Sequence, residues 1–222
     1  MQLEYSISQD VYAFTARRDE QLPVEVTVGH QVHGNAVAVV DRPGMKKEEL
    51  EGYDALVTNQ KGLAIGVRTA DCIPILLFDR KKKVVAAVHS GWKGTLQRIC
   101  KSTLFLMNNR FRLEAKDIIA VIGPGISGKY FQVGVEVVNA FKEMDFPLNM
   151  IYSWTAPQKN GDMLTGHHLD LVVANRWLLE QEGVKPENII VSGICTYENT
   201  GFFSARREGS DCGRNISAIM LR

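Results

Sequence analysis

The chain has 222 residues, a formal net charge of +1 and a hydrophobic fraction of 45%. This near-neutral balance argues against binding to nucleic acid or to an anionic membrane surface. The longest apolar runs are far too short to span a bilayer, and residues 1–5 do not begin a secretory signal. Four scattered cysteines without a Cys-x-x-Cys pair favour a reduced, cytoplasmic protein over a disulfide framework.

Short strands dominate the first half of the chain. They are rich in Val, Ile and Leu and are bounded by Gly, Pro, Asn or Asp. The predicted strands are residues 24–29, 36–41, 54–58, 63–67, 73–79 and 84–89. Three lysines, Lys81 to Lys83, separate the last two strands and predict a solvated hairpin turn.

The first predicted helix comprises residues 96–108, where apolar side chains recur at helical spacing. The remaining predictions are strands at 118–122, 130–133, 189–192 and 216–221, and helices at 135–144 and 169–182. Residues 145–168 are irregular, and long loops of this kind are often functional or mobile. Many strands precede the first long helix, which predicts an α+β (mixed α/β) fold. We expect one domain over residues 1–222, a layered sandwich of mixed β-sheets flanked by helices.

His33, Cys72 and His89 are the candidate metal ligands, each in a segment where a strand meets a loop. Two imidazoles and one thiolate can hold zinc and leave a fourth position open, as catalytic zinc sites do. The three residues are far apart in sequence, so three elements would have to meet. Spacing alone is a weak signal, because a free cysteine is often a small core residue and a histidine at a strand end is often structural.

Several strings of residues together resemble the laccase-domain family. They are Gln31-Val32-His33, Thr69-Ala70-Asp71-Cys72-Ile73-Pro74, Ala87-Val88-His89-Ser90-Gly91-Trp92, Gly123-Pro124-Gly125-Ile126, Phe131-Gln132-Val133-Gly134, Phe203-Ser204-Ala205-Arg206-Arg207-Glu208-Gly209 and Gly213-Arg214-Asn215. The resemblance spans nearly the whole chain. It implies that His33, Cys72 and His89 bind a metal, zinc or alternatively copper.

The resemblance also implies purine nucleoside phosphorylase and adenosine deaminase activity. The expected partners are a purine nucleoside (adenosine, inosine or methylthioadenosine) and phosphate, and the expected assembly is a monomer or homodimer. Together with Cys72 and His89, we include Asp71 among the catalytic candidates, as a proton acceptor or as a group that orients a ligand. On a strand, however, its side chain would point opposite to that of Cys72, so a backbone-capping role is equally consistent.

Phosphate requires a cation, and the candidates are Arg68, Lys93, Arg206, Arg207 and Arg214. The family usually has Arg where this chain has Lys93, which keeps the charge but loses the planar fork. The structural alternative for each arginine is an ordinary ion pair.

Gln31 and Asn35 flank His33 and could bind the base or the ribose, or could be turn residues. His30 is a reserve ligand. We expect His167 and His168, which precede a predicted helix, to face solvent.

Two other functions remain open. A copper-dependent polyphenol oxidase could use the His-Cys-His set, but five histidines are too few for a blue-copper site and a trinuclear cluster together. A metal-free cysteine hydrolase could use Cys72 as nucleophile and His89 as base. Residues 123–128 fit the string G-x-G-x-x-G, but no helix is predicted to begin within the glycines, so we interpret them as a turn.

Overall fold

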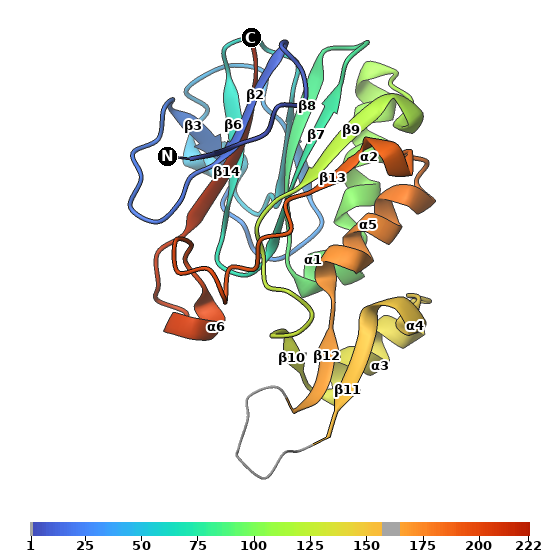
Figure 1. The fold of residues 1–222 in the computed structure, drawn as a ribbon. Coiled ribbons are helices and arrows are strands. Elements are labelled where there is room, and N and C mark those ends of the chain that lie inside the picture. The colour runs from blue at the N-terminus through green and yellow to red at the C-terminus, as the bar shows by residue number, and fades with distance from the viewer. Residues whose placement is uncertain (1, 157–164) are drawn as a thin grey trace.

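The computed structural model describes residues 2–156 and 165–222 and contains two large mixed β-sheets layered with helices (Figure 1). The five-stranded sheet has the order β1 (Leu3–Glu4), β2 (Val11–Thr15), β14 (Asn215–Leu221), β6 (Ala64–Thr69) and β3 (Val26–Val28). The six-stranded sheet has the order β13 (Ile189–Val191), β9 (Ile118–Ile122), β7 (Ile73–Asp79), β8 (Val84–Ser90), β5 (Ala55–Thr58) and β4 (Val37–Val39). The predicted α+β class is confirmed.

A small third sheet lies at one end of the two large ones, as Figure 1 shows. Its order is β10 (Gln132–Val133), β12 (Gly166–Leu169) and β11 (Tyr152–Thr155). The α-helices are α1 (Trp92–Leu96), α2 (Ile99–Phe111), α3 (Val135–Glu143), α4 (Leu148–Ile151), α5 (Leu171–Gln181) and α6 (Ala205–Glu208). Short 3-10 helices are η1 (Lys47–Leu50), η2 (Ala115–Asp117) and η3 (Pro186–Asn188).

Strand β7 is apolar almost throughout because both of its faces are buried. Ile75 and Leu77 pack toward the helices α2 and α5, whereas Leu76 and Phe78 pack toward the five-stranded sheet. Successive side chains of a strand point to opposite faces, so one strand contributes to two cores. The result is a continuous apolar run rather than an alternating one.

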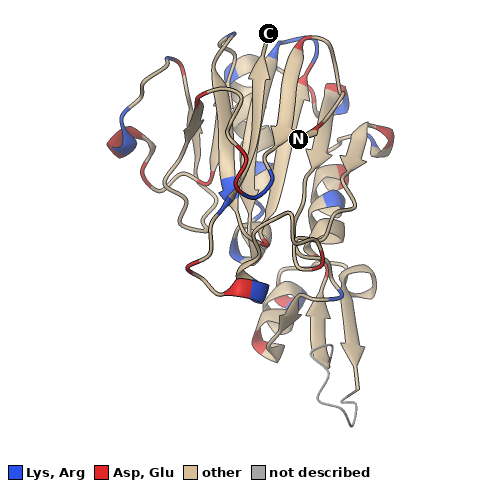
Figure 2. Cartoon of the chain, turned by 60° about the vertical axis from the view of Figure 1, so that its left-hand side comes forward, with Lys and Arg blue, Asp and Glu red and all other residues tan. Residues whose placement is uncertain are grey.

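The hairpin between β7 and β8 turns at Arg80 to Lys83, as predicted from the lysine run, and these residues are exposed. Asp79 holds the turn, since its Oδ1 accepts the backbone N–H groups of Lys81 (2.7 Å) and Lys82 (2.8 Å). Residues 123–128 follow β9, and no helix begins before α3, so the rejection of a dinucleotide-binding motif is confirmed. The expected tight turn is not found over the whole string: Gly125 forms a β-bridge with Cys195, and the turn begins at its end, where Tyr130 N donates to Ser127 O at 3.0 Å. Lysines, arginines and carboxylates are interspersed over the fold, as Figure 2 shows.

Several predicted boundaries were wrong. The predicted helix 96–108 corresponds to α2, which begins only at Ile99 because Arg98 adopts a left-handed conformation at φ 57°. The short helix α1 before it was not predicted. Strand β2 was missed, and the predicted strand 130–133 shortens to β10. The prediction that His168 faces solvent is wrong: it lies on β12, the central strand of the small sheet, and is 2% exposed.

The irregular stretch 145–168 contains α4, β11 and β12, while residues 157–164 lie outside the described ranges. Within residues 2–156 and 165–222, every helix is too short or too polar to cross a lipid bilayer.

Candidate metal centre

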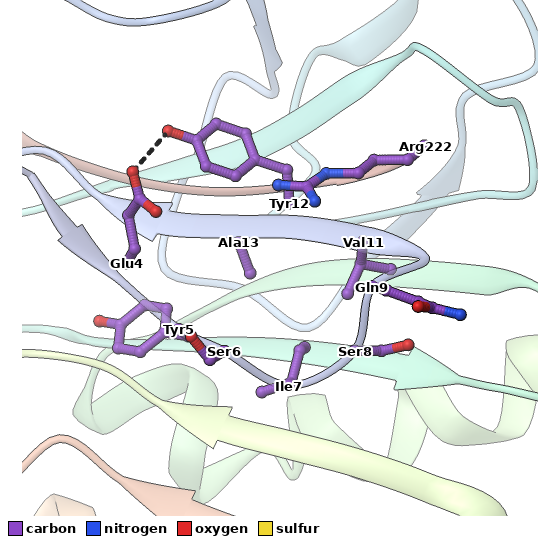
Figure 3. A pocket seen from close by; sticks show the side chains of 10 residues that line it. All are labelled: Glu4, Tyr5, Ser6, Ile7, Ser8, Gln9, Val11, Tyr12, Ala13 and Arg222. Carbon is purple, nitrogen blue, oxygen red and sulfur yellow. Dashed lines mark hydrogen bonds between the residues drawn. The ribbon is translucent and has the colours of Figure 1, made fainter.

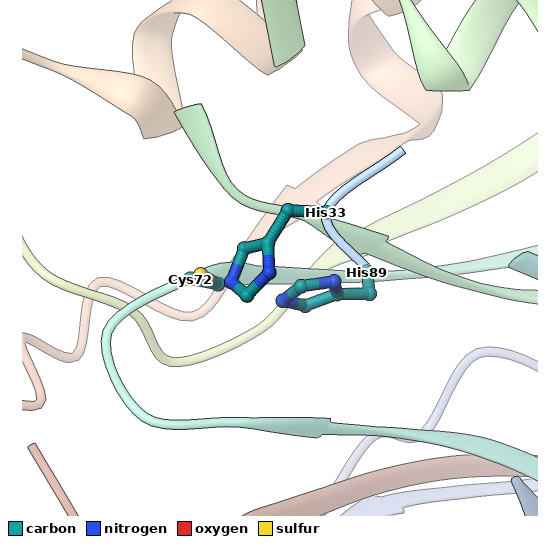
Figure 4. A group of neighbouring side chains, drawn as sticks. All are labelled: His33, Cys72 and His89. Atoms are coloured by element: carbon teal, nitrogen blue, oxygen red, sulfur yellow. The ribbon is translucent and has the colours of Figure 1, made fainter. Parts of the chain in front are cut away.

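His33, Cys72 and His89 converge at one end of the two large sheets. Figure 4 shows the three side chains pointing toward one another, and their possible ligand atoms all lie within 4.8 Å of each other. His33 comes from the loop between β3 and β4, Cys72 from the residue before β7, and His89 from β8. The imidazole rings of His33 and His89 are 4.9 Å apart between centroids and inclined by 73°. The arrangement is suited to a metal ion held by three protein ligands.

Sheet register explains why Cys72 lies beside the end of β8. In the antiparallel pair, Ile73 is opposite Ser90, so Cys72 falls opposite Gly91. Gly91 has no side chain, and a Cβ there would lie 2.9 Å from Cys72 Sγ and 3.0 Å from His33 Cδ2. A larger residue would therefore press on two of the three candidate ligands.

Asp54 is the organising residue that sequence reasoning missed. It is fully buried and precedes β5, where Ala55 pairs with Val88, so it falls opposite His89. Its Oδ1 accepts hydrogen bonds from His89 Nδ1 (2.7 Å) and His33 N (2.9 Å). Its Oδ2 accepts from Val32 N (3.0 Å) and Gly34 N (2.9 Å). One carboxylate thus orients the ring of one candidate ligand and the backbone loop of another, an arrangement common around metal-bound histidines.

The hydrogen bond to Asp54 leaves Nε2 of His89 as the nitrogen available to a metal. Burial lowers the pKa of His89, but the Asp54 carboxylate and the Cys72 thiolate outweigh it and raise the pKa to about 9. Burial likewise raises the pKa of the Cys72 thiol, but hydrogen bonds with His33 and His89 lower it to about 6. The thiolate, which is the form that binds metal, is therefore favoured at neutral pH.

A cavity of about 460 Å³ opens beside the cluster. Its lining residues are Gly29, His30, Gln31, His33, Arg68, Thr69, Ala70, Cys72, His89, Ala205, Ser210 and Arg214. A separate cavity of about 380 Å³ lies at the β1–β2 loop beside Arg222, and Figure 3 shows that it is lined by none of the candidate residues. The cavity beside the cluster is therefore the candidate substrate pocket.

Three of the candidate substrate-binding residues, Gln31, Arg68 and Arg214, line this pocket. The Gln31 side chain pairs with the Arg68 backbone, because Nε2 donates to Arg68 O and Oε1 accepts from Arg68 N, each at 2.8 Å. The Arg68 side chain is exposed on β6. His30, the reserve ligand, also lines the pocket, but it pairs with Glu51 and lies outside the three-residue cluster.

The other predicted substrate-binding residues lie elsewhere. Asn35 donates to the carbonyl of Gln97 at 3.2 Å, and Lys93 lies over the ring of Trp92 with Nζ 5.6 Å from its centroid. Neither Asn35 nor Lys93 lines the pocket.

The two neighbouring arginines bind backbone carbonyls. Arg206 donates to Tyr130 O (3.3 Å) and Gln132 O (2.9 Å). Arg207 donates to the carbonyls of Thr196 (2.6 Å), Tyr197 (2.7 Å) and Phe202 (2.6 Å). In this arrangement both guanidinium groups hold the C-terminal segment in place. Arg214 lines the pocket, but its side chain donates to loop carbonyls, including Ser210 O at 2.8 Å.

Asp71 lies between β6 and β7 with φ 88°, so the chain has left the strand geometry that would have fixed its direction. Its Oδ1 accepts from Thr196 Oγ1 and its Oδ2 from Arg206 N, both at 2.7 Å. These contacts correspond to the capping role left open above. Through them the C-terminal segment holds the loop that carries Cys72.

Comparison with known proteins places this chain in a family. A family model described as multi-copper polyphenol oxidoreductase laccase matches residues 8–222. A purine nucleoside phosphorylase of Bacteroides thetaiotaomicron is 36% identical over 208 residues, covering 90% of this chain and 75% of the relative. Adenosine deaminase RL5, from an unknown prokaryotic organism, is 41% identical over 203 residues, covering 88% of this chain and 74% of the relative.

Solved structures agree with these matches at the level of the fold. YlmD from Geobacillus stearothermophilus superposes with a TM-score of 0.82 at 24% identity, covering 98% of this chain and 94% of that one. Protein YfiH from Bacillus licheniformis also superposes with a TM-score of 0.82, at 24% identity, covering 96% of this chain and 93% of that one. The named relatives support an enzyme, and the chain belongs to the multi-copper polyphenol oxidoreductase laccase family.

Proposed function

We propose that this protein is a zinc-dependent purine nucleoside phosphorylase that also deaminates adenosine. Its nucleoside substrates are adenosine, inosine and methylthioadenosine, which phosphate cleaves to the free base and the sugar 1-phosphate. The observation that carries the proposal is the convergence of three candidate ligands within 4.8 Å beside a cavity of about 460 Å³. The names of the two relatives described above support the same chemistry.

The donor set of His33, Cys72 and His89 fits zinc, which accepts thiolate sulfur and imidazole nitrogen and keeps an open position in catalytic sites. Asp54 supports this fit, because it fixes the ring of His89 with Nε2 free. When bound, zinc supplies Lewis acidity that polarises a substrate oxygen. Copper, the metal in the family description, accepts the same donors, so the metal itself is to be measured.

Phosphorolysis requires the chain to bind and orient phosphate. A phosphate oxygen forms a bond to ribose C1′ while the C1′–N9 bond breaks. The bonding pair passes to purine N9, and the phosphate proton ends on the base. We assign phosphate binding to Arg68, which lines the cavity and whose guanidinium has no hydrogen bond or ion pair to the residues in the described ranges. A guanidinium can bind phosphate through two parallel hydrogen bonds.

A cysteine hydrolase is the second candidate, and one observation favours it. Asp54 accepts a hydrogen bond from His89, and Cys72 lies on the other side of the cluster within 4.8 Å, so that His89 could take the thiol proton and Asp54 could orient the imidazole. That reading leaves His33 without a role, although His33 lies within 4.8 Å of both other groups. The metal reading uses all three residues and is therefore preferred.

The decisive experiment combines metal analysis with a phosphate-dependence assay. Protein purified without added metal should contain close to one zinc per chain. It should release adenine and ribose 1-phosphate from adenosine only when phosphate is present. The variant Cys72→Ser should lose both zinc and activity. The matched control Cys195→Ser, at a partly exposed thiol outside the cluster, should keep both.

Other results would point to the alternatives. Zinc-free protein with phosphate-independent hydrolysis and a readily alkylated Cys72 would indicate the cysteine hydrolase. Oxygen consumption with a phenol, lost in Cys72→Ser, would indicate the oxidase.

A further inference from the structure

Three buried polar side chains form a closed ring of hydrogen bonds next to the three candidate metal ligands, His33, Cys72 and His89. Ser90 at the end of β8 donates its hydroxyl to Asn175 Oδ1 on α5 at 2.7 Å. Asn175 Nδ2 donates to Thr95 Oγ1 on α1 at 3.0 Å, and the two hydroxyl oxygens are 2.9 Å apart. Because the Ser90 proton is already used, the Thr95 hydroxyl donates to Ser90. All three residues are 0% exposed.

The amide of Asn175 has one orientation that satisfies its surroundings. Its second N–H donates to the carbonyl of Leu171 at 2.8 Å, and a carbonyl can only accept. Its oxygen also accepts the thiol of Cys100 on α2 at 3.6 Å. Every donor and acceptor of the amide is therefore used, and four elements (β8, α1, α2 and α5) meet at one side chain. A fully satisfied buried network of this kind is rigid.

The ring holds both ends of the segment from Ser90 to Thr95. Gly91, inside this segment, lies against two ligands: a Cβ built on it would meet Cys72 Sγ at 2.9 Å and His33 Cδ2 at 3.0 Å. Thr95 N donates to Gly91 O at 2.8 Å, which ties the segment to itself. Gly94 lies close to the loop that carries His33, since its Cβ would be 3.1 Å from Gly34 O. Movement of this segment would therefore displace Cys72 and His33.

We propose that Asn175 is a positioning residue for the three candidate metal ligands, although it lies on α5 and is not itself a candidate ligand. This inference rests on the proposed metal site. By bonding Ser90 and Thr95 together, Asn175 fixes Gly91 at the distance that lets Cys72, His33 and His89 meet around one ion. Residues that orient metal ligands typically change metal affinity about tenfold or more when they are replaced.

The test uses zinc affinity, measured by chelator competition, and the absorption spectrum of the cobalt-substituted protein. Asn175→Leu keeps the branching and the number of heavy atoms of the side chain but removes the amide, and Thr95→Val removes one hydroxyl with little change in shape. Both variants should weaken zinc binding by about tenfold or more and shift the cobalt ligand-field bands. The control is Leu178→Ala, also buried on α5 but in the apolar core, which should lower the melting temperature and leave zinc affinity within about twofold.

Each outcome has one meaning. Unchanged zinc affinity and cobalt spectra in the variants, with normal metal binding by the wild-type protein, would overturn the inference and leave the proposed function standing. A loss of affinity in Leu178→Ala equal to that in Asn175→Leu would show a general effect of stability and would also overturn it. Wild-type protein that binds neither zinc nor cobalt would overturn both proposals. If Asn175→Leu fails to fold, the smaller change Thr95→Val decides the question.

Discussion

Replacing Asp54 with Asn removes one negative charge and keeps the shape of the side chain. We nevertheless expect it to disturb the candidate metal site severely. Each carboxylate oxygen accepts two hydrogen bonds, one oxygen from His89 Nδ1 and His33 N, the other from Val32 N and Gly34 N. An amide keeps one oxygen and places an NH₂ group where the other was. If the NH₂ group faces Val32 and Gly34, two backbone N–H donors lose their acceptor. If it faces His89 and His33, the N–H of His33 loses its acceptor, and His89 keeps a hydrogen bond only by moving its proton to Nε2, the nitrogen needed for the metal.

The magnitude follows from these contacts. A buried donor left without a partner costs about 1–3 kcal/mol, so one or two of them should lower the free energy of unfolding by about 1–6 kcal/mol. That is a large share of the roughly 5–15 kcal/mol by which a typical domain is stable. Zinc affinity should fall by about 10- to 100-fold, because the His89 ring and the His33 loop lose their common anchor.

Urea denaturation in the presence of a chelator measures the first effect, and zinc competition measures the second. Asp79→Asn is the matched control, a buried aspartate at the opposite end of β7. One Asp79 oxygen accepts both N–H groups of the turn, and an amide oxygen can do the same, so the loss of stability should be small and zinc affinity unchanged. If Asp54→Asn stays within about 1 kcal/mol of wild-type stability and binds zinc normally, the assigned role of the carboxylate is wrong.

In metal-free protein at pH 7, iodoacetamide should label Cys72, whose thiol pKa is about 6, and spare Cys100, whose burial raises the thiol pKa to about 12. Peptide mass spectrometry checks this, and faster labelling of Cys100 would contradict it. The ion pair with Arg18 outweighs desolvation and lowers the pKa of Glu208 from 4.5 to about 2, so its stabilising effect is present above pH 4.5 and is lost as the pH falls toward 2. Glu208→Gln should therefore be less stable than wild type at pH 7 in urea denaturation, and the difference should shrink by pH 3; a constant difference would refute this. Arg68→Ala should raise KM for phosphate by about 10- to 100-fold, the equivalent of about one charge-assisted hydrogen bond, while KM for adenosine changes little. Steady-state kinetics with each substrate varied decide this, and equal changes in both constants would argue against the phosphate assignment.

The local sequence pattern predicted those strands and helices whose burial does not depend on pairing with a distant segment of the chain. The bounds of β7 follow from an apolar run closed by Asp79, and the structure reproduces them. Strand β2 was missed because its burial comes from pairing with β14 at the other end of the chain, with Val11 opposite Leu221. The predicted start of α2 was three residues too early because the apolar spacing continues from Leu96 through Arg98, whose left-handed backbone carries no signal in that spacing.

The candidate ligands could be found from short motifs, but the groups that hold them could not, and sheet register is the reason. Asp54 reaches His89 because β5 pairs with β8 in one alignment, and Cys72 meets Gly91 because β7 pairs with β8 in another. A slip of one residue in either pair would move the apolar side chains of β7 or β5 from one core to the other. The different shapes of the two cores, rather than burial alone, therefore favour both alignments. The three candidate metal ligands are thus positioned by the same packing that stabilises the two sheets. Substitutions in the core that preserve this register should leave the three candidate ligands in place. A single methyl group added at Gly91 should displace them.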